Sequence, residues 1–263
     1  EIRPCDWSSD VCSSDLIGAA VDETFSTITG PLMQTKDRDG RVDYRVMPRD
    51  ADDVVASDSI YLVQNGTVAT GATVDVVDVI VTSHKRSNGF FVQVRPGSGV
   101  YVPEYSGVFV YLSTTDAQTV SVLRGDVVRV TGAVVELGNH TMIRVTAASQ
   151  VTVMESNDEE LPPLTYNTAA FFGGWTGDPE PYEGTLVHIE YVRVDEVLSG
   201  GLYYVSAGGD YTSGQVAVDD WFYDLRATAG DMYTYIQGPL MQTVDHDGHV
   251  DYRIMPRDSS DDR

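Results

Sequence analysis

The chain has 263 residues, of which 42% are hydrophobic, and its formal net charge at pH 7 is −23. A chain of this length holds one large domain or two small ones, and either can bury a hydrophobic core. No apolar run approaches the roughly 18 residues that a membrane-spanning helix needs, so we expect no transmembrane segment.

Both cysteines lie in the first sixteen residues, within the segment CDWSSDVCSSDL at 5–16. Their spacing is not that of metal ligands. Codons for this segment match a common sequencing-library adapter, so we interpret residues 1–16 as translated adapter rather than natural protein. A natural loop closed by two cysteines is the alternative. No signal peptide opens the sequence, which implies that any export signal has been lost or was never included.

A long internal repeat organises the rest of the chain. The segment 30–50, GPLMQTKDRDGRVDYRVMPRD, returns at 238–258 with 17 of 21 positions identical. Repetition at a fixed offset indicates a modular array. We therefore expect residues 17–56 to be the last strands of a truncated module, followed by complete modules at 57–157 and 158–263. Because an isolated two-stranded hairpin is marginally stable in water, we expect residues 17–56 to be frayed or to pair with another module's edge.

Valine, threonine and tyrosine dominate the remaining segments, and turns recur every 8–12 residues, which is typical of an all-β sandwich or barrel. The first module contains five predicted strands, at 73–83, 89–94, 107–112, 126–137 and 141–145. The second module repeats this pattern of lengths at 185–197, 202–207, 215–222, 231–243 and 249–255.

The first strand of each module changes the face on which its apolar residues lie. In the first module Val74 and Val76 precede Val77, Val79 and Val81; in the second, Val187, Ile189 and Tyr191 precede Val192 and Val194. Such a change requires a β-bulge. Glycines near the middle of the fourth strands, Gly132 and Gly238, favour a sharp bend. These features predict two tandem five-stranded Greek-key barrels of the OB-fold type, with a seven-stranded immunoglobulin-like sandwich as the alternative.

The segments GFFVQV, YSGVFVYL and VLRGDVVRVTGAVVEL resemble OB-fold modules of bacterial secreted nucleases and surface lipoproteins. In the second module EPYEGTLVHIEYVRV, VAVDDWFYD and YRIMPRD resemble the module that follows in those proteins. The resemblance covers about residues 20–262. It implies an extracellular or surface location and a neighbouring endonuclease/exonuclease/phosphatase-type domain. We find none of that domain's metal-binding constellations in this chain, so we do not expect the chain to be an enzyme.

The densest basic cluster, His84, Lys85 and Arg86, lies between the first two strands of the first module. Loops and strands at this position form the ligand face of OB-folds. Basic groups beside aromatic rings are what single-stranded nucleic acid needs. We therefore predict a binding face that also contains the following neighbours: Phe90, Gln93, Arg95, Tyr101 and Tyr105. Aromatic residues of a core, beside a solvated loop, would give the same pattern.

Two acidic turns are candidates for calcium. They contain Asp37, Asp39 and Asp43 in the first copy of the repeat, and Asp245, Asp247 and Asp251 in the second. Carboxylates at this spacing suit Ca²⁺, but the EF-hand pattern is incomplete and Asp-Gly is itself a strong hairpin signal. A plain turn is the alternative, and no other cofactor is expected.

Residues 60–153 carry no net charge, whereas residues 160–263 carry five positive and eighteen negative groups. The second module should therefore repel a phosphate backbone. Its acidic edge, Asp219 and Asp220 beside Trp221, suits a cation or a sugar. The leading hypothesis is a non-catalytic binding or positioning region accessory to an extracellular nuclease. It would contact single-stranded nucleic acid through the first module. A structural spacer in a cell-surface repeat array is the alternative.

Overall fold

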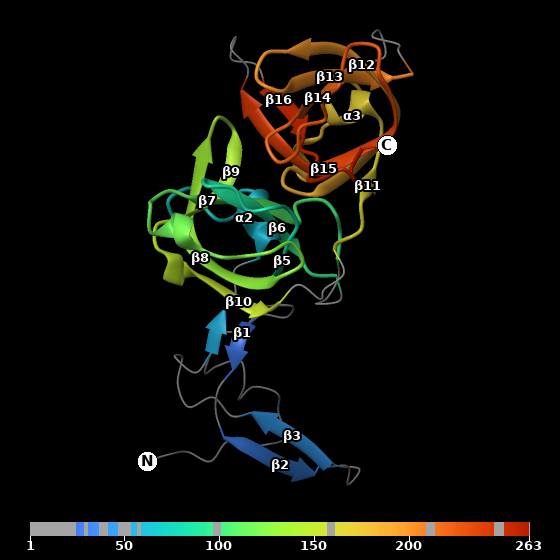
Figure 1. The fold of residues 1–263 in the computed structure, drawn as a ribbon. Helices are drawn as coiled ribbons and strands as arrows, with labels where there is room; N and C mark the ends of the chain where they lie inside the picture. Colours follow the sequence, from blue (N-terminus) through green and yellow to red (C-terminus); the bar gives the residue numbers. More distant parts are fainter. Residues whose placement is uncertain are drawn as a thin grey trace. The chain divides into compact units, whose positions relative to one another are not determined.

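The structure is a computed structural model, and the chain forms two compact units, Glu1–Asp58 and Ser59–Arg263. The structure describes residues 25–28, 31–36, 42–46, 54–56, 59–96, 101–156, 161–208, 214–244 and 250–262 (Figure 1). The predicted adapter segment, 1–16, lies outside these residues. The predicted module boundaries stay predictions.

The first unit contains two short antiparallel pairs of strands. Strand β1 (Phe25–Ile28) pairs with β4 (Val54–Ala56), and β2 (Leu32–Lys36) pairs with β3 (Val42–Val46). The β2–β3 pair is the hairpin that the sequence predicts for the first copy of the repeat.

The second unit begins with a closed barrel, which we call the first barrel. Its five strands are β5 (Thr73–Val81), β6 (Gly89–Val94), β7 (Gly107–Leu112), β8 (Val127–Leu137) and β9 (His140–Val145). Pairing runs β5-β6-β7-β9-β8 and returns to β5, with β7 and β9 parallel. This closed ring is the predicted OB-fold topology, and it excludes the sandwich alternative.

The second barrel has the same topology. Its strands are β12 (Leu186–Leu198), β13 (Leu202–Ala207), β14 (Gln215–Asp219), β15 (Met232–Val244) and β16 (Val250–Ile254). They pair in the order β12-β13-β14-β16-β15 and return to β12. The predicted strand 215–222 ends early, at Asp219, because the chain turns before Trp221.

Each barrel carries one strand that the sequence did not predict. Strand β10 (Val151–Glu155) pairs with β8, and β11 (Thr165–Tyr166) pairs with β12. The helices are short: α2 (Ile60–Gln64), α3 (Ala169–Phe172), and 3₁₀ turns at Ala117–Thr119, Ala148–Gln150 and Glu180–Tyr182. Within the described ranges, no helix has the length and apolarity to cross a membrane.

Both first strands switch faces at an equivalent point. In β5 the register shifts just before Val79, and Asp78 has a φ of 57°. In β12 Ile189 and Val192 both lie in the core, and Tyr191 between them has a φ of 52°. The predicted change of face is therefore confirmed. Tyr191, expected among the core residues, is 67% exposed because the positive φ turns its side chain outward.

Glycines mark the point at which each fourth strand passes from one partner to the other. In β8, Ala133 pairs with both Thr73 of β5 and Arg144 of β9. A Cβ on the preceding Gly132 would lie 2.6 Å from the Arg144 carbonyl oxygen. Gly238 occupies the same place in β15, where a Cβ would lie 2.1 Å from the Met255 oxygen. A side chain at either position would prevent the barrel from closing.

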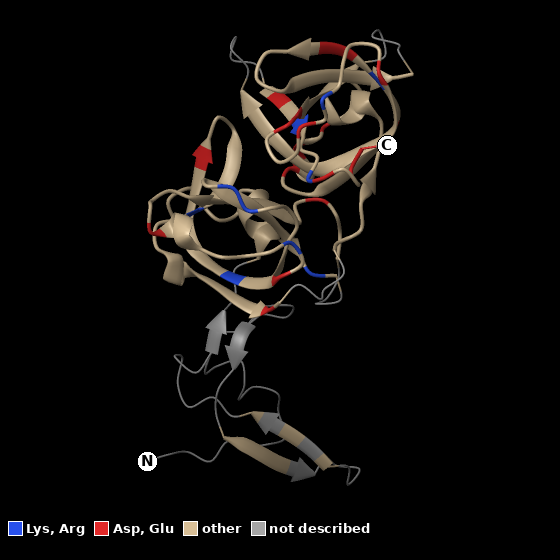
Figure 2. Cartoon of the chain, viewed as in Figure 1, with Lys and Arg blue, Asp and Glu red and all other residues tan. Residues whose placement is uncertain are grey.

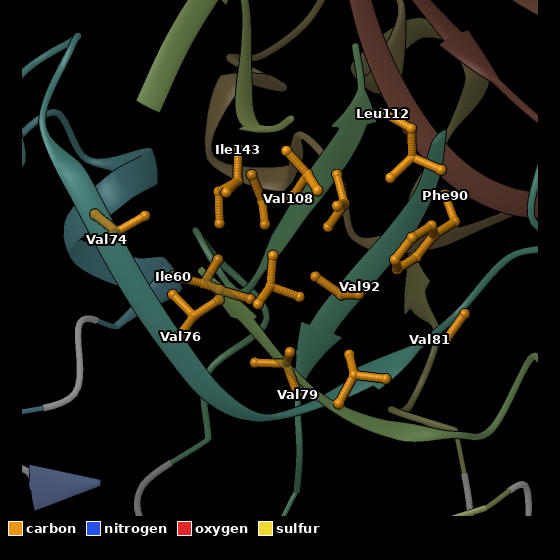
Figure 3. Close-up of a cluster of buried hydrophobic side chains, with 14 of the residues drawn as sticks. Ile60, Val74, Val76, Val79, Val81, Phe90, Val92, Val108, Leu112 and Ile143 are labelled. Carbon is orange, nitrogen blue, oxygen red and sulfur yellow. The ribbon is translucent and has the colours of Figure 1, made fainter. Parts of the chain in front are cut away.

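Valines fill the first barrel (Figure 3). Val74 and Val76 from the first half of β5 and Val79 and Val81 from the second half all point into the same cluster. The helix α2 adds Ile60 to this cluster from before the first strand. The face switch in β5 therefore lets one strand line the barrel along its whole length.

The two copies of the repeat have the same register but different surroundings. Leu32 pairs with Val46 in the first copy, as Leu240 pairs with Ile254 in the second. Leu32 is 67% exposed, whereas Leu240 is 0% exposed within the second barrel. The same local sequence therefore forms the same hairpin with or without a barrel around it.

Candidate functional site

The predicted basic loop lies between β5 and β6, and it contacts the second barrel. Arg86 donates a hydrogen bond through Nη2 to the Phe222 carbonyl oxygen, 2.7 Å away. Its guanidinium carbon is 6.0 Å from the centre of the Phe222 ring. Lys85 donates through Nζ to the Gln118 carbonyl oxygen at 2.7 Å, within its own barrel. His84, the third member, is half exposed.

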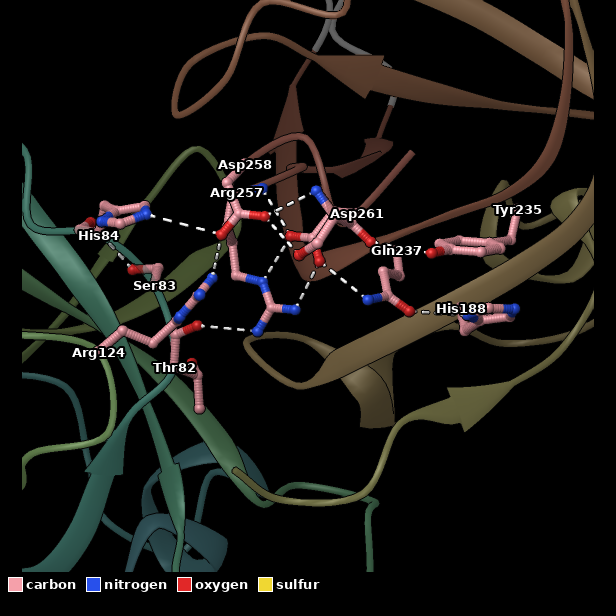
Figure 4. Close-up of polar contacts among 11 residues, drawn as sticks. Thr82, Ser83, His84, Arg124, His188, Tyr235, Gln237, Arg257, Asp258 and Asp261 are labelled. Atoms are coloured by element: carbon pink, nitrogen blue, oxygen red, sulfur yellow. Dashed lines mark hydrogen bonds and ion pairs between the residues drawn. The ribbon is translucent and has the colours of Figure 1, made fainter. Parts of the chain in front are cut away.

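An acidic residue of the second barrel lies beside this basic loop. The Asp258 carboxylate lies 2.6 Å from Arg124 Nη1 and 4.0 Å from His84 Nε2 (Figure 4). Burial lowers the pKa of His84, and the Arg124 guanidinium lowers it further. The imidazole is therefore mostly neutral at pH 7 and adds little to the attraction for phosphate.

Two of the predicted ligand-binding residues lie inside the protein. Phe90 is 0% exposed and points into the core of the first barrel, so its ring is not available for stacking, contrary to the prediction. Gln93 is also 0% exposed. Its side chain donates to Tyr101 Oη at 2.7 Å and accepts from the Leu186 backbone N–H at 3.1 Å. Gln93 therefore joins the two barrels rather than facing a ligand.

The remaining predicted residues are engaged locally. Arg95 forms ion pairs with Asp78 at 3.0 Å and Glu155 at 3.1 Å. Tyr105, which has a φ of 60°, donates its backbone N–H to the Pro181 carbonyl oxygen at 2.5 Å. Tyr101 is half-buried against Gln93. The structure thus brings Gln93, Tyr101 and Tyr105 to the contact between barrels and leaves Arg95 away from the His84–Arg86 loop.

The calcium prediction falls largely outside the described residues. Asp37, Asp39, Asp245 and Asp247 are not described, and of Asp43 only the position in β3 is given. Asp251 lies in β16 with its carboxylate 3.0 Å from Arg253 Nε. Among the residues that are described, no group of three His, Cys, Asp or Glu side chains is arranged to hold a metal ion. Calcium binding by these turns stays a prediction.

A cluster of aromatic and sulfur side chains joins the barrels, and we call this contact region the junction. Phe91, Phe109 and Met142 project outward from β6, β7 and β9 and pack against Phe222 and Met255 of the second barrel. The Phe91 and Phe109 rings are 4.9 Å apart, and the Phe91 and Phe222 rings are 6.1 Å apart. The outer face on which OB-folds usually hold ligands is therefore covered by the second barrel.

The sequence contains a signal for this burial that the prediction of a binding face overlooks. A strand with one solvated face alternates apolar and polar residues, whereas a strand covered on both faces is nearly continuously apolar. GFFVQV and GVFVYL, at 89–94 and 107–112, are of the second kind. Their outward aromatic residues could have been interpreted as a contact surface rather than a stacking platform.

A buried ion pair also joins the barrels. Arg257 and Asp261 of the second barrel are 5% and 0% exposed, and Arg257 Nε lies 2.6 Å from Asp261 Oδ2. The same guanidinium donates through Nη1 to the Thr82 carbonyl oxygen in the first barrel at 3.2 Å (Figure 4). Since a buried charge without its partner is costly, this arrangement favours one relative placement of the barrels.

The junction contains a second pair of buried ionisable groups. His140 Nε2, at the start of β9, lies 3.5 Å from Glu183 Oε1, and the two side chains are 3% and 1% exposed. Burial lowers the pKa of His140 to about 3. Burial also raises the pKa of Glu183 well above its usual range, and Glu180 and Glu136 raise it further. His140 is therefore uncharged at neutral pH. Glu183 also accepts the Thr141 backbone N–H at 2.9 Å.

A pocket of about 420 Å³ lies at the open edge of the junction, and we call it the junction pocket. Its lining comes from both barrels and includes Phe109, Tyr111, Asp219, Trp221 and three methionines. The Trp221 ring is 5.6 Å from Phe109 and 4.9 Å from Phe222. Trp221 and Asp219 form the acidic and aromatic edge singled out in the sequence, which the fold places opposite Phe109 and Tyr111.

Positive charge is dispersed in this unit. Blue segments in Figure 2 lie on several strands and loops of the first barrel rather than on one face. Several of these cations are paired, such as Arg129, whose guanidinium bonds the Asp75 carboxylate. Because nucleic-acid binding depends on unpaired cations that displace counterions, this distribution offers only a small basic surface.

A scan of the chain against protein-family models and a search of curated proteins found no match. Among solved structures, the chain is similar to the p204 HINb domain, with 14% identity and a TM-score of 0.34 over 71% of this chain and 93% of that one. It is also similar to a replication protein A heterotrimer bound to ssDNA, with 11% identity and a TM-score of 0.25 over 81% of this chain and 72% of that one.

A third similar structure is a multidomain protein with nucleic acid binding domains from Streptococcus pneumoniae. The identity is 13% and the TM-score 0.18, over 69% of this chain and 45% of that chain. Likeness of this degree does not transfer a function, so the closed strand order of each barrel is what assigns the fold.

Proposed function

We propose that residues 59–263 are a non-catalytic positioning region in which two OB-fold barrels act as one rigid body. The observation that supports this most is the junction, where the outer face of β6, β7 and β9 packs against the second barrel. A flexible linker between independent barrels would leave Phe91 and Phe109 in water, which costs free energy roughly in proportion to their apolar area. Their burial favours a fixed separation between the two ends of the unit.

We further propose that this region belongs to a secreted or surface-attached bacterial protein and positions a nuclease domain of the same protein. The resemblance of the module sequences motivates this setting. The acidic second barrel fits a role in solubility and spacing better than capture of a polyanion. A spacer in a surface repeat array would use the same rigid unit without any catalytic neighbour.

Rigidity can be tested by measuring the distance between spin labels on the two barrels of the full chain. Cys5 and Cys12 are first replaced by serine, and the exposed Ser149 and Ser199 are replaced by cysteine to carry the labels. We expect one narrow distance distribution. A broad distribution would show that the barrels move independently and would contradict the proposal.

A matched pair of arginine variants identifies the cause of the rigidity. Arg257→Ala removes the buried guanidinium that bonds Thr82 and should broaden the distance distribution. Arg226→Ala removes an arginine of the same barrel whose side chain is 87% exposed, and should leave the distribution unchanged. Equal effects of the two substitutions would show that the ion pair does not hold the junction.

A second candidate function is contact with single-stranded nucleic acid at the rim of the junction. The observation that favours it is the exposure of His84 and Arg86 on the loop that leads to Gly89, which pairs with the partly buried Tyr111. Because Phe90 and Gln93 are buried, the face is smaller than predicted, and we expect weak binding.

Binding of nucleic acid is tested by the fluorescence anisotropy of a labelled deoxythymidine oligonucleotide titrated with the full chain at low and physiological salt. Contact through the loop requires binding that weakens with salt and with the double substitution Lys85→Ala/Arg86→Ala. Arg226→Ala is the control for loss of one positive charge. An affinity that changes neither with salt nor with the Lys85→Ala/Arg86→Ala substitution would eliminate this candidate function.

A further inference from the structure

The junction pocket combines groups that attract a cation. Three aromatic rings line it: Phe109 and Tyr111 from β7, and Trp221 from the turn after β14. Aromatic faces attract cations through the negative charge above the ring plane, and tryptophan does so most strongly. Among the residues that the structure describes, no lysine or arginine lines the pocket.

Among the described lining residues, the group charged at neutral pH is a carboxylate. Asp219 lies at the end of β14, where its Oδ1 accepts the Trp221 backbone N–H at 3.0 Å, so that the acid and the indole are held together. His140 also lines the pocket, and burial lowers its pKa to about 3, so it contributes no positive charge at neutral pH.

The neighbouring charges leave this edge negative. Arg253 lies 3.0 Å from both Asp219 and Asp251, so these three groups carry a net charge of −1. Burial raises the pKa of the adjacent Asp220, and the negative charges of Asp219 and Asp224 raise it further. Arg86 of the first barrel acts in the opposite sense, since its positive charge lowers the pKa of Asp220, and its guanidinium donates to the Phe222 carbonyl oxygen.

We propose that the junction pocket binds an organic ammonium group, with the cation held by the Trp221 and Tyr111 rings and the Asp219 carboxylate. A phosphate-bearing ligand would meet the same carboxylate with unfavourable charge. The volume of about 420 Å³ lies in the range of small-molecule sites and exceeds what a bare metal ion needs. The site goes beyond the positioning role, although it exists only while the barrels are docked.

Methionine methyl NMR gives a direct readout on the full chain. Three of the seven methionines, Met142, Met241 and Met255, line the pocket. Two others, Met154 and Met232, are 56% and 59% exposed elsewhere. The probe is choline, and its control is 3,3-dimethylbutan-1-ol, which has the same shape with carbon in place of the charged nitrogen. We expect choline to shift the three pocket signals saturably and to leave Met154 and Met232 unchanged.

The neutral alcohol distinguishes a pocket that recognises positive charge from one that binds any apolar group of the same shape. We expect it to bind about tenfold more weakly than choline, which is the size of a typical desolvated cation–π contribution. Equal affinities would show that shape and apolar burial alone fill the pocket, and would overturn the proposal. Absence of shifts with choline would overturn it as well, as would an oligonucleotide that shifts the pocket methyls where choline does not.

Two substitutions test the assigned residues. Trp221→Leu should weaken the binding of choline about tenfold, because it removes the indole ring that attracts the cation. Asp219→Asn keeps the oxygen that accepts the Trp221 backbone N–H but removes the negative charge. We expect it to weaken the binding of choline severalfold and to leave the binding of the neutral alcohol unchanged. Glu190→Gln, which changes a carboxylate of the second barrel that is 57% exposed and does not line the pocket, is the control. Unperturbed Met154 and Met232 signals verify folding, and choline affinity unchanged in both variants would refute the assignment.

Discussion

The backbones of Gly107 and Gly184 are in direct contact at the junction. A Cβ on Gly107 would lie 2.2 Å from the Gly184 carbonyl carbon and oxygen, and a Cβ on Gly184 would lie 2.5 Å from the Gly107 carbonyl carbon. Gln64 donates through Nε2 to the carbonyl oxygens of Gly107 and of Glu183. The absence of two side chains is therefore what lets the barrels approach closely enough to bury the aromatic cluster.

This close approach predicts the effect of alanine at Gly184. Gly184 has a φ of 76°, and Gly66 has a φ of 75° with nothing within 4 Å of a Cβ. Alanine at either position meets the same backbone strain, but only at Gly184 does it also clash with the other barrel. We expect Gly184→Ala to lower the free energy of unfolding by about 1–3 kcal/mol more than Gly66→Ala, as measured by urea denaturation. Equal losses of unfolding free energy in the two variants would show that the junction accommodates the added Cβ without a loss of stability.

The two copies of the repeat should differ in backbone protection. Tyr44 is 61% exposed in the first copy, and its counterpart Tyr252 is 8% exposed in the second. Their amino-acid sequences are nearly the same, so their intrinsic amide exchange rates are nearly the same. We expect exchange in β15–β16 to be slower than in β2–β3 by at least on the order of a hundredfold, since only the former is held by a barrel.

Peptide-level hydrogen exchange on the full chain measures this difference directly. The peptides 30–50 and 238–258 serve as each other's sequence control. Comparable protection of the two peptides would mean that the first hairpin is covered by other parts of the protein in solution.

The pH dependence of stability should report the buried pair at the junction. Burial lowers the pKa of His140 to about 3, so between pH 3 and 6.5 the unfolded chain binds a proton that the folded chain does not. Stability therefore rises with pH in this window by up to about 1.4 kcal/mol per pH unit. Burial raises the pKa of Glu183, so its own contribution is present at low pH and is lost as pH rises above its ordinary value of 4.5.

Substitutions separate these opposing effects. His140→Gln should reduce the rise of the unfolding free energy with pH below pH 6.5. Glu183→Gln should reduce the fall of the unfolding free energy with pH above pH 4.5. Urea denaturation between pH 4 and 8 measures both. Glu190→Gln, which changes a carboxylate that is 57% exposed, is the control. Profiles of the two junction variants that match the unsubstituted chain would show that the pair does not couple protons to docking.

The face switch in β12 predicts a stabilising glycine. Tyr191 has a φ of 52°, a conformation that strains a residue with a Cβ, and its ring is 67% exposed. We expect Tyr191→Gly to raise the free energy of unfolding by about 1 kcal/mol, since strain is relieved and little burial is lost. Glu196→Gly, at an exposed position of the same strand, should instead lower it by roughly 0.5–1 kcal/mol. Thermal denaturation distinguishes the two, and a lower melting temperature for Tyr191→Gly would contradict the assigned strain.

The sequence alone determined the strands and the barrels. Alternation of valines, the change of face after Val76 and after Tyr191, and Gly132 and Gly238 are local features, and each has its effect within a few residues of its position. For that reason the predicted strands agree with the observed ones within a residue or two at almost every end. The repeat likewise predicts the register that Leu32 and Leu240 share.

Only the tertiary structure decided which apolar faces meet water. A ring that stacks on a ligand and a ring that packs on another barrel have the same spacing along a strand, so Phe91 and Phe109 could not be assigned from their pattern. The burial of Gln93 and the pocket between Tyr111 and Trp221 depend on the contact of Gly107 with Gly184, which are far apart in the chain. The alternation of residues along a strand shows on which face each side chain lies. Only the docking of the two barrels determines what covers that face.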